Sequence, residues 1–162
     1  MTTKNLSRRS QARSAARLAA VQALYQHDME RTPVARLLDE FHQHRLGQEI
    51  EDIPFAKADV AFFDDLVRGA AARRDEIDGL LSAKLAAGWS LARLDRTMLQ
   101  VLRAGAFELL ARPDVPRATV ISEYVDVAKA FFDDGQARFA NGVLDALAGE
   151  VRTQPAPSSS RT

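Results

Sequence analysis

Basic side chains recur on one face near the start of the chain, and they are the residues best suited to bind an anion. Arg9, Arg13 and Arg17 are spaced four residues apart in a segment that contains no Gly or Pro. In a helix this spacing keeps the three side chains within an arc of about 80°. Arg8 extends the same surface, and we call these four residues the arginine ridge. Because guanidinium groups pair bidentately with phosphates and stack on bases, the ridge predicts contact with nucleic acid.

A second candidate site joins a cation to an aromatic ring. Arg138 and Phe139 are adjacent and directly follow the acidic turn Asp133–Gly135, at the expected start of a helix. Such a pair can stack on the bases of single-stranded nucleic acid, with a gain of about 1–3 kcal/mol per base. The alternative is that Phe139 belongs to the core and Arg138 only neutralises the acidic turn. The residues alone leave both interpretations open.

No group of residues has the spacing required for catalysis or metal binding. The three histidines lack the Glu-x-x-His and His-x-x-x-His patterns of helical metal sites. The adjacent aspartates at 64–65 and at 133–134 diverge on a helix, and the glycines are scattered singly without a phosphate-binding pattern. The absence of Cys excludes thiolate zinc sites and cysteine nucleophiles. We therefore expect no enzymatic activity, no metal and no cofactor.

The charges sum to zero but are unevenly distributed along the chain. Residues 1–27 contain five of the 22 basic residues and no acid, which leaves a net charge of −5 for the rest. A basic end on an acidic body favours an anionic partner. With 46% hydrophobic and 27% charged residues, the composition is that of a globular domain. No apolar run reaches the length of a membrane span and no secretory signal is present, so we expect a cytoplasmic protein.

Hydrophobic periodicity predicts an all-α fold of about seven helices, forming a single domain over residues 8–152. Residues 95–112 are the expected centre, because apolar positions cover about half of this helix and Asp95 is well placed as its N-cap. Gly105 would allow a neighbouring helix to approach closely. Phe107 lies on the polar side, so it either meets another helix, which we favour, or lines a partner surface.

The remaining helices are bounded by capping residues, Pro and Gly. We expect Gly88 to stop the helix that precedes the central one. Residues 1–7 are predicted to be a flexible basic N-terminus, residues 47–54 a loop, and residues 153–162 a disordered tail rich in Pro and Ser. The predicted helices cover residues 8–29, 33 to about 41, 57–74, 75–87 and 136–151, and one more follows Pro116 and ends near residue 132.

Four runs of this sequence resemble the NusB family in order and spacing. They are RSAARLAAVQALYQ (13–26), GWSLARLDRTMLQVLRAGAFELL (88–110), DVPRATVISEYVDVAKAF (114–131) and RFANGVLDALA (138–148). The resemblance implies an all-α fold of two packed helical subdomains and a non-enzymatic role in transcription antitermination. It implies binding to boxA, a single-stranded RNA element of nascent ribosomal RNA transcripts, together with NusE, a small-subunit ribosomal protein, in the antitermination complex of RNA polymerase.

The resemblance also assigns roles to individual residues. Matching positions imply RNA contacts from Arg13, Arg17, Arg138 and Phe139, with Arg8 and Arg9 extending the ridge. It thus favours an RNA-facing role for Phe139 over a core role. Tyr25 is a candidate for the NusE side and is equally compatible with the core. The segment 31–58 is longer than in the family, and the family leaves monomer and homodimer both open.

Two alternative functions remain. The same helical fold serves as the RNA-binding front domain of ribosomal RNA cytosine methyltransferases, but those chains continue into a catalytic domain with a Gly-rich loop and a reactive Cys. A helical adaptor that binds only proteins would leave the arginines solvated. Binding to boxA and to scrambled RNA, with and without NusE, separates this adaptor from an antitermination factor.

Overall fold

The structure is a computed structural model that describes residues 2–44 and 59–152, with side chains from residue 8 onward. The described residues form seven α-helices and one short 3₁₀ helix, with no strand among them, which confirms the all-α prediction. The elements are α1 (Thr2–Glu30), α2 (Val34–His44), α3 (Val60–Ala72), α4 (Arg74–Ser82), η1 (Leu91–Arg93), α5 (Arg96–Ala111), α6 (Arg117–Phe131) and α7 (Asp134–Val151).

Helix α5 is the centre of the molecule, as its sequence predicted. It packs against α1, α3, α4, α6 and α7, and every residue from Met98 to Leu109 is buried. The carboxylate of Asp95 accepts hydrogen bonds from the backbone N–H groups of Thr97, at 2.8 Å, and Met98, at 3.2 Å. This N-cap satisfies backbone donors that have no partner within the helix.

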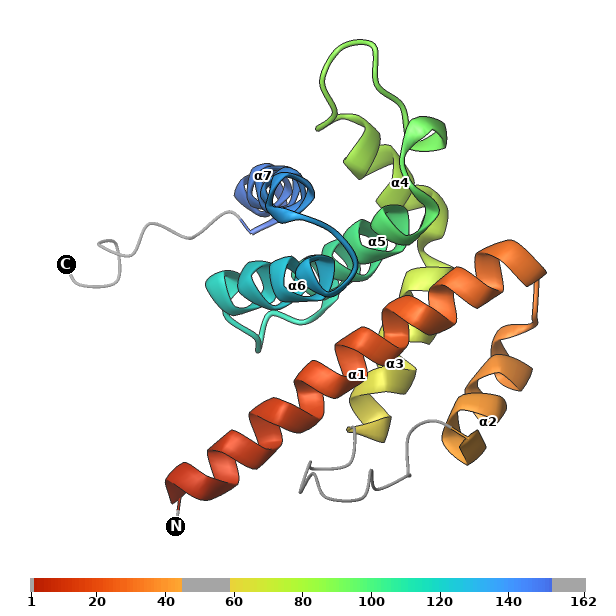
Figure 1. Ribbon diagram of the computed structural model, residues 1–162, viewed down its shortest axis with the longest axis vertical. Helices are drawn as coiled ribbons and strands as arrows, with labels where there is room; N and C mark the ends of the chain where they lie inside the picture. Colours follow the sequence, from red (N-terminus) through yellow and green to blue (C-terminus); the bar gives the residue numbers. More distant parts are fainter. Residues whose placement is uncertain (1, 45–58, 153–162) are drawn as a thin grey trace, which may run out of the picture.

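The other helices form two packed groups on either side of α5. In the first group α1, the long red-to-orange helix of Figure 1, packs with α2 and α3. In the second group α6 and α7 pack closely together and both contact α5, while α4 lies against α5 and α7. Since α1 also contacts α5 and α6, the two helical subdomains share one continuous hydrophobic core.

Two small residues set the closest approaches between helices. A Cβ atom built at Gly69 of α3 would lie 2.0 Å from Cζ of Phe107, so the aromatic ring occupies the space that a side chain would need. A Cβ atom at Gly105 would lie 3.1 Å from the methyl groups of Leu144 and 3.3 Å from the ring of Tyr124. Both predictions are confirmed: Phe107 meets another helix, and Gly105 is a packing residue.

Several helix boundaries differ from the predicted ones. Helix α1 begins at Thr2 and not at Arg8, because no Gly or Pro interrupts the first residues. Helix α4 ends at Ser82, and Gly88, with φ of 88°, lies in the following loop and does not stop the helix. Asp133 caps α7 by accepting a hydrogen bond from the backbone of Gln136 at 3.0 Å, so the expected acidic turn forms the start of that helix.

Two predicted segments, the loop at 47–54 and the tail at 153–162, lie outside the described residues. None of the helices that the structure describes is both long enough and apolar enough to cross a membrane.

Candidate nucleic-acid interface

The arginine ridge is exposed at its N-terminal end and buried at its C-terminal end. Arg8 and Arg9 are exposed, and neither forms a hydrogen bond or an ion pair with another described residue. Arg13 is half-buried, and only 3% of Arg17 is exposed. The prediction that Arg17 belongs to an outward-facing ridge is therefore wrong.

Arg17 is buried because the face of α1 on which it lies continues into the core. Val21 and Leu24, one and two turns further along the same side, are both buried. The guanidinium of Arg17 pairs with the fully buried carboxylate of Glu108, at 2.7 Å between Nη2 and Oε2 and 2.9 Å between Nε and Oε1. Burial opposes the charge of Arg17, but the bonds and charges of its acidic partners outweigh this effect and raise its pKa.

The pair of Arg17 and Glu108 is part of a larger network that joins three helices. Nη1 of Arg17 donates to Glu123 of α6 at 2.8 Å, and Oγ of Ser14 donates to the same carboxylate at 2.6 Å. The hydroxyl of Tyr124 donates to Glu108 at 2.9 Å. Burial of Tyr124, together with the charge of Glu108, raises its pKa well above the usual value near 10. The network fixes α1 against α5 and α6, and thereby sets the direction of the exposed arginines.

Three guanidinium groups surround the ring of Phe62, which is itself buried at the start of α3. The carbon of each guanidinium lies over this ring, at 4.5 Å for Arg13, 5.0 Å for Arg17 and 4.9 Å for Arg112. Arg13 also lies 3.7 Å from the carboxylate of Asp59, but its buried Nε atom has no hydrogen-bond partner. Arg13 thus supports the fold while part of its side chain remains accessible.

All three guanidinium nitrogens of Arg112 donate hydrogen bonds to acidic residues of the protein. It donates two hydrogen bonds of 3.0 Å to Asp114 and one of 3.0 Å to Asp65. The bond from Arg112 lowers the pKa of Asp114, and the same bond is the main cause of a raised pKa for Arg112. We therefore assign Arg112 to the fold and not to RNA contact.

Arg138 and Phe139 occupy different environments although they are adjacent on α7. Arg138 is exposed and forms no hydrogen bond or ion pair within the described part of the chain. Phe139 is half-buried and packs against the core. The aromatic ring therefore combines a core contact with a surface edge. Helix α6 packs against both α1 and α7 (Figure 1).

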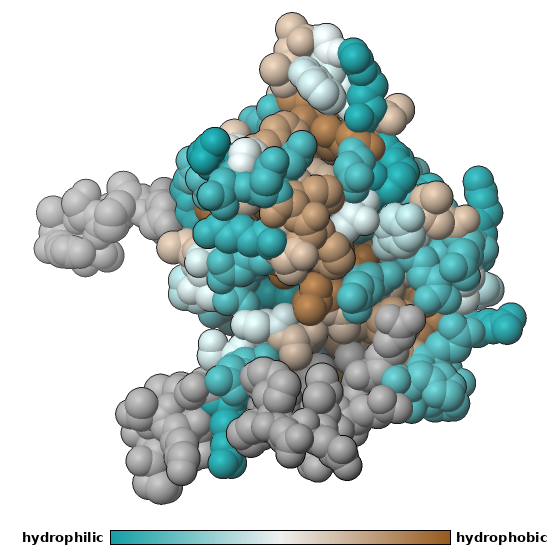
Figure 2. Space-filling model, viewed as in Figure 1, coloured by the Kyte–Doolittle hydropathy of each residue, from teal (hydrophilic) through white to brown (hydrophobic). Residues whose placement is uncertain are grey.

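Tyr25 is on the surface, so it does not belong to the core. It is 39% exposed, close to Phe131 at the end of α6, which is 42% exposed. Both line a shallow hollow of about 350 Å³, together with Gln22 and Thr97. Figure 2 shows hydrophobic side chains on the viewed face between α7 and α1. Exposed aromatic side chains of this kind suit a protein partner better than an RNA backbone.

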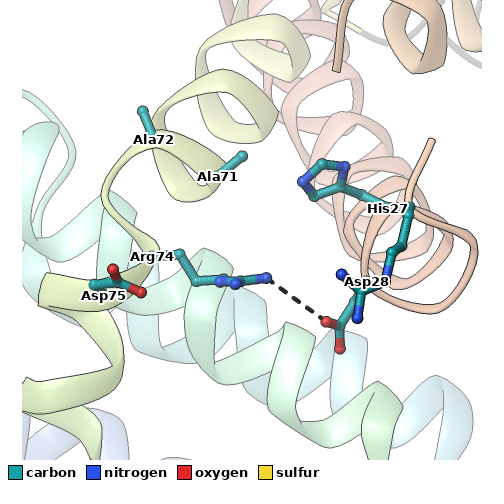
Figure 3. A pocket seen from close by; sticks show the side chains of 7 residues that line it. His27, Asp28, Ala71, Ala72, Arg74 and Asp75 are labelled. Carbon is teal, nitrogen blue, oxygen red and sulfur yellow. Dashed lines mark ion pairs between the residues drawn. The ribbon is translucent and has the colours of Figure 1, made fainter. Parts of the chain in front are cut away.

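A further hollow of about 490 Å³ lies at the end of α1, beside the junction of α3 and α4 (Figure 3). The carboxylate of Asp28 lies 3.8 Å from Arg74 and accepts a hydrogen bond from Gln100 at 3.0 Å. Two acids and two arginines face this space, so its charges balance and do not favour a phosphate. It is lined by His27, Asp28, Arg31, Ala71, Ala72, Arg74 and Asp75.

The acids that bind Arg17 are not predicted by the sequence pattern. Glu108 is the only charged residue between Ala104 and Leu110, in an otherwise apolar helix. A carboxylate in such a position requires a cationic or hydrogen-bonding partner. On α1, Arg17 lies on the same face as the buried Val21, which indicates a buried cation. Neither observation shows that Arg17 and Glu108 pair with each other, because the two residues are far apart in sequence.

Comparison with known proteins agrees with this architecture. The sequence model of the NusB family matches residues 14–149. The transcription antitermination protein NusB of Novosphingobium aromaticivorans is 74% identical to this chain over 141 residues, which cover 87% of this chain and 95% of that protein.

Solved structures show the same fold. NusB of T. maritima matches with a TM-score of 0.71 and 31% identity, covering 85% of this chain and 91% of that one. A second match is a chain from a crystal structure of the antitermination factors NusB and NusE in complex with double-stranded RNA. It has a TM-score of 0.72 and 26% identity, and the match covers 86% of this chain and 97% of that one. Sequence and structure therefore place this chain in the NusB family.

Proposed function

We propose that this protein is a transcription antitermination factor that binds boxA single-stranded RNA together with NusE and catalyses no reaction. The observation that carries the proposal is that Arg8, Arg9 and Arg138 are exposed and pair with no other described residue, on a chain of the NusB family. Unpaired guanidinium groups are free to bind phosphates. The relative named above is called a transcription antitermination protein, and a structural relative was solved with NusE and RNA.

In this proposal the RNA-binding residues divide into contact and positioning roles. Arg8, Arg9 and the exposed part of Arg13 contact the RNA backbone from α1. Arg138 contacts it from α7, where the accessible edge of Phe139 meets a base. Arg17 contacts no RNA.

Arg17 acts through the network with Glu108 and Glu123, which holds α1 in place. A fixed α1 presents the arginines in one orientation, so less entropy is lost when RNA binds.

The surface around Tyr25 and Phe131 is the proposed contact for NusE. Its two exposed rings flank a shallow hollow, an arrangement typical of the aromatic anchors in protein interfaces. The surface is formed by the C-terminal half of α1, Thr97 of α5 and the end of α6, whereas Arg8 and Arg9 lie in the N-terminal part of α1. NusE bound there would therefore leave these two arginines accessible. Joint binding of RNA and NusE would then bring both to RNA polymerase.

A gel shift on boxA RNA, with scrambled RNA as the reference, tests the RNA contacts. We expect Arg8→Ala, Arg9→Ala and Arg138→Ala each to weaken boxA binding about tenfold or more, since a hydrogen bond to a charged group contributes about 1.5–3 kcal/mol. Arg36→Ala is the matched control, because Arg36 is an exposed arginine on α2 whose partner is Glu40. Equal loss in Arg36→Ala would reveal only a general charge effect.

Calorimetric titration with NusE tests the partner surface. We expect Tyr25→Ala and Phe131→Ala to weaken NusE binding by about 2 kcal/mol or more, the loss typical of a central interface residue. Val60→Ala is the control, because Val60 is similarly exposed, at 40%, but lies on α3. Unchanged affinity in both aromatic variants would place NusE elsewhere.

A further inference from the structure

We propose that Trp89 and Arg93, in the loop between α4 and α5, form a separate stacking contact for single-stranded RNA. One base stacks on the accessible face of Trp89, and Arg93 pairs with a neighbouring phosphate. The inference rests on the proposed function in one respect only, that the ligand is RNA. It concerns a different surface, because the loop lies at the opposite end of the molecule from the N-terminus of α1 (Figure 1).

Trp89 is 54% exposed, more than any other large hydrophobic side chain that the structure describes. The loop that carries Trp89 is fixed by hydrogen bonds. The N–H of Trp89 donates to the carbonyl of Ala86 at 3.0 Å, and the positive φ of Gly88 allows the sharp turn before it. A ring presented in a fixed position loses little entropy when a ligand stacks on it.

Arg93 is positioned next to the indole ring by the same loop. Its guanidinium carbon lies 5.2 Å from the ring centre, and Nη1 donates to the carbonyl of Gly88 at 2.8 Å. The base of the loop is fixed in turn, since Arg96 donates to the carbonyls of Leu91 and Leu94. Because more than half of Trp89 stays exposed, the arginine covers only part of the ring.

The residues around the ring favour a nucleic acid over a protein as the ligand. Between residues 79 and 94 the sequence has two basic residues and no acid. Lys84 pairs with Glu150 at 2.7 Å, whereas Arg93 has no acidic partner in the described residues. The larger apolar side chains of the loop, Leu85 and Leu91, pack against the core. The exposed neighbours are small, so a flat base can approach the ring: Ala86, Ala87, Gly88, Ser90 and Ala92.

A cation beside an accessible indole matches the two parts of a nucleotide. Bases of any sequence stack on aromatic rings, and a guanidinium neutralises the adjacent phosphate. The contact would therefore be independent of RNA sequence, and it would bind nucleotides that flank the segment bound by Arg8 and Arg9. A longer RNA would then extend from one end of the molecule to the other.

The test uses the fluorescence of Trp89, the only tryptophan of the chain. The full-length protein is titrated with boxA RNA extended on either side by single-stranded uridines, and dye-labelled RNA reports affinity by anisotropy. We expect quenching of Trp89 that saturates together with the anisotropy. Trp89→Ala should weaken binding of the extended RNA about 5- to 100-fold, and Trp89→Phe should retain most of it. Arg93→Ala should reduce the salt slope of log K by about 0.7, and Arg93→Lys should restore it.

The outcomes separate this inference from the proposed function. Full RNA binding by anisotropy with unchanged Trp89 fluorescence, and equal affinity of Trp89→Ala, would overturn the loop contact alone. Absence of RNA binding to the wild type would overturn the proposed function as well. Quenching by NusE but not by RNA would identify the loop as a protein contact and would also overturn the inference.

Discussion

The guanidinium of Arg17 and the carboxylate of Glu108 meet inside the core, with 2.7 Å between Nη2 and Oε2, although 91 residues separate them in the sequence. The pair fastens α1 to α5, and Glu123 and Tyr124 extend the connection to α6. Arg17, a predicted RNA ligand, is therefore a residue of the fold. The ridge on α1 reaches solvent only through Arg8, Arg9 and part of Arg13.

Replacing Arg17 should destabilise the protein strongly. Arg17→Ala leaves the buried carboxylate of Glu108 without its cation, and we expect a loss of about 3–5 kcal/mol in the free energy of unfolding. Urea denaturation measures this loss. Arg9→Ala on the same helix is the control, with an expected change within about 0.5 kcal/mol, because Arg9 is exposed and pairs with no other described residue. Equal stability of the two variants would contradict the assigned role of Arg17.

The salt dependence of RNA binding should report how many phosphates are contacted. If three to five are neutralised, log K should fall with log salt at a slope of about −2 to −3.5. Combining Arg8→Ala with Arg9→Ala should reduce this slope by roughly 1.4, at about 0.7 per phosphate, without lowering the thermal midpoint. Filter binding at several salt concentrations gives the slope. An unchanged slope would mean that neither arginine contacts a phosphate.

Gly69 should tolerate no side chain, whereas Gly79 should accept one. In Gly69→Ala the new methyl group would overlap the buried ring of Phe107, and we expect a loss of about 1–3 kcal/mol. Gly79 lies in α4 with no atom within 4 Å of a built Cβ, so Gly79→Ala should stabilise by about 0.4–1 kcal/mol. Thermal unfolding compares the two variants. Adding Phe107→Leu to Gly69→Ala should recover part of the loss if the ring is the cause.

Tyr124 should make the protein less stable in alkali. Its pKa is raised by burial and by Glu108, so above about pH 10 an unfolded tyrosine loses its proton while the folded one keeps it. The free energy of unfolding should therefore decrease by up to about 1.4 kcal/mol per pH unit in this range. Urea denaturation at increasing pH measures the decrease, and Tyr124→Phe should reduce it.

Direct titration provides a second measurement of the same residue. The chain has two tyrosines, so in Tyr25→Phe the ultraviolet absorbance of tyrosinate comes from Tyr124 alone. It should rise only as the protein unfolds. A rise near pH 10 in the folded protein would contradict the assigned burial of the hydroxyl.

The sequence by itself determined the helical architecture. Periodicity and capping identified α5, its N-cap at Asp95 and the packing role of Gly105, because these depend on contacts within one helix or on the width of its apolar face. Helix ends were predicted less well, as at α4, because the last turn of a helix is stabilised by whatever packs on it.

Only the tertiary structure decided which charged and aromatic residues reach solvent. Arg9 and Arg17 have the same side chain on the same helix, and their difference is set by Glu108 and Glu123, which α5 and α6 bring to one of them. Likewise, only the fold brings the exposed Tyr25 of α1 next to Phe131 at the end of α6. A local pattern specifies the face of a helix on which a residue lies, but the burial of a charge depends on a partner supplied by distant parts of the chain.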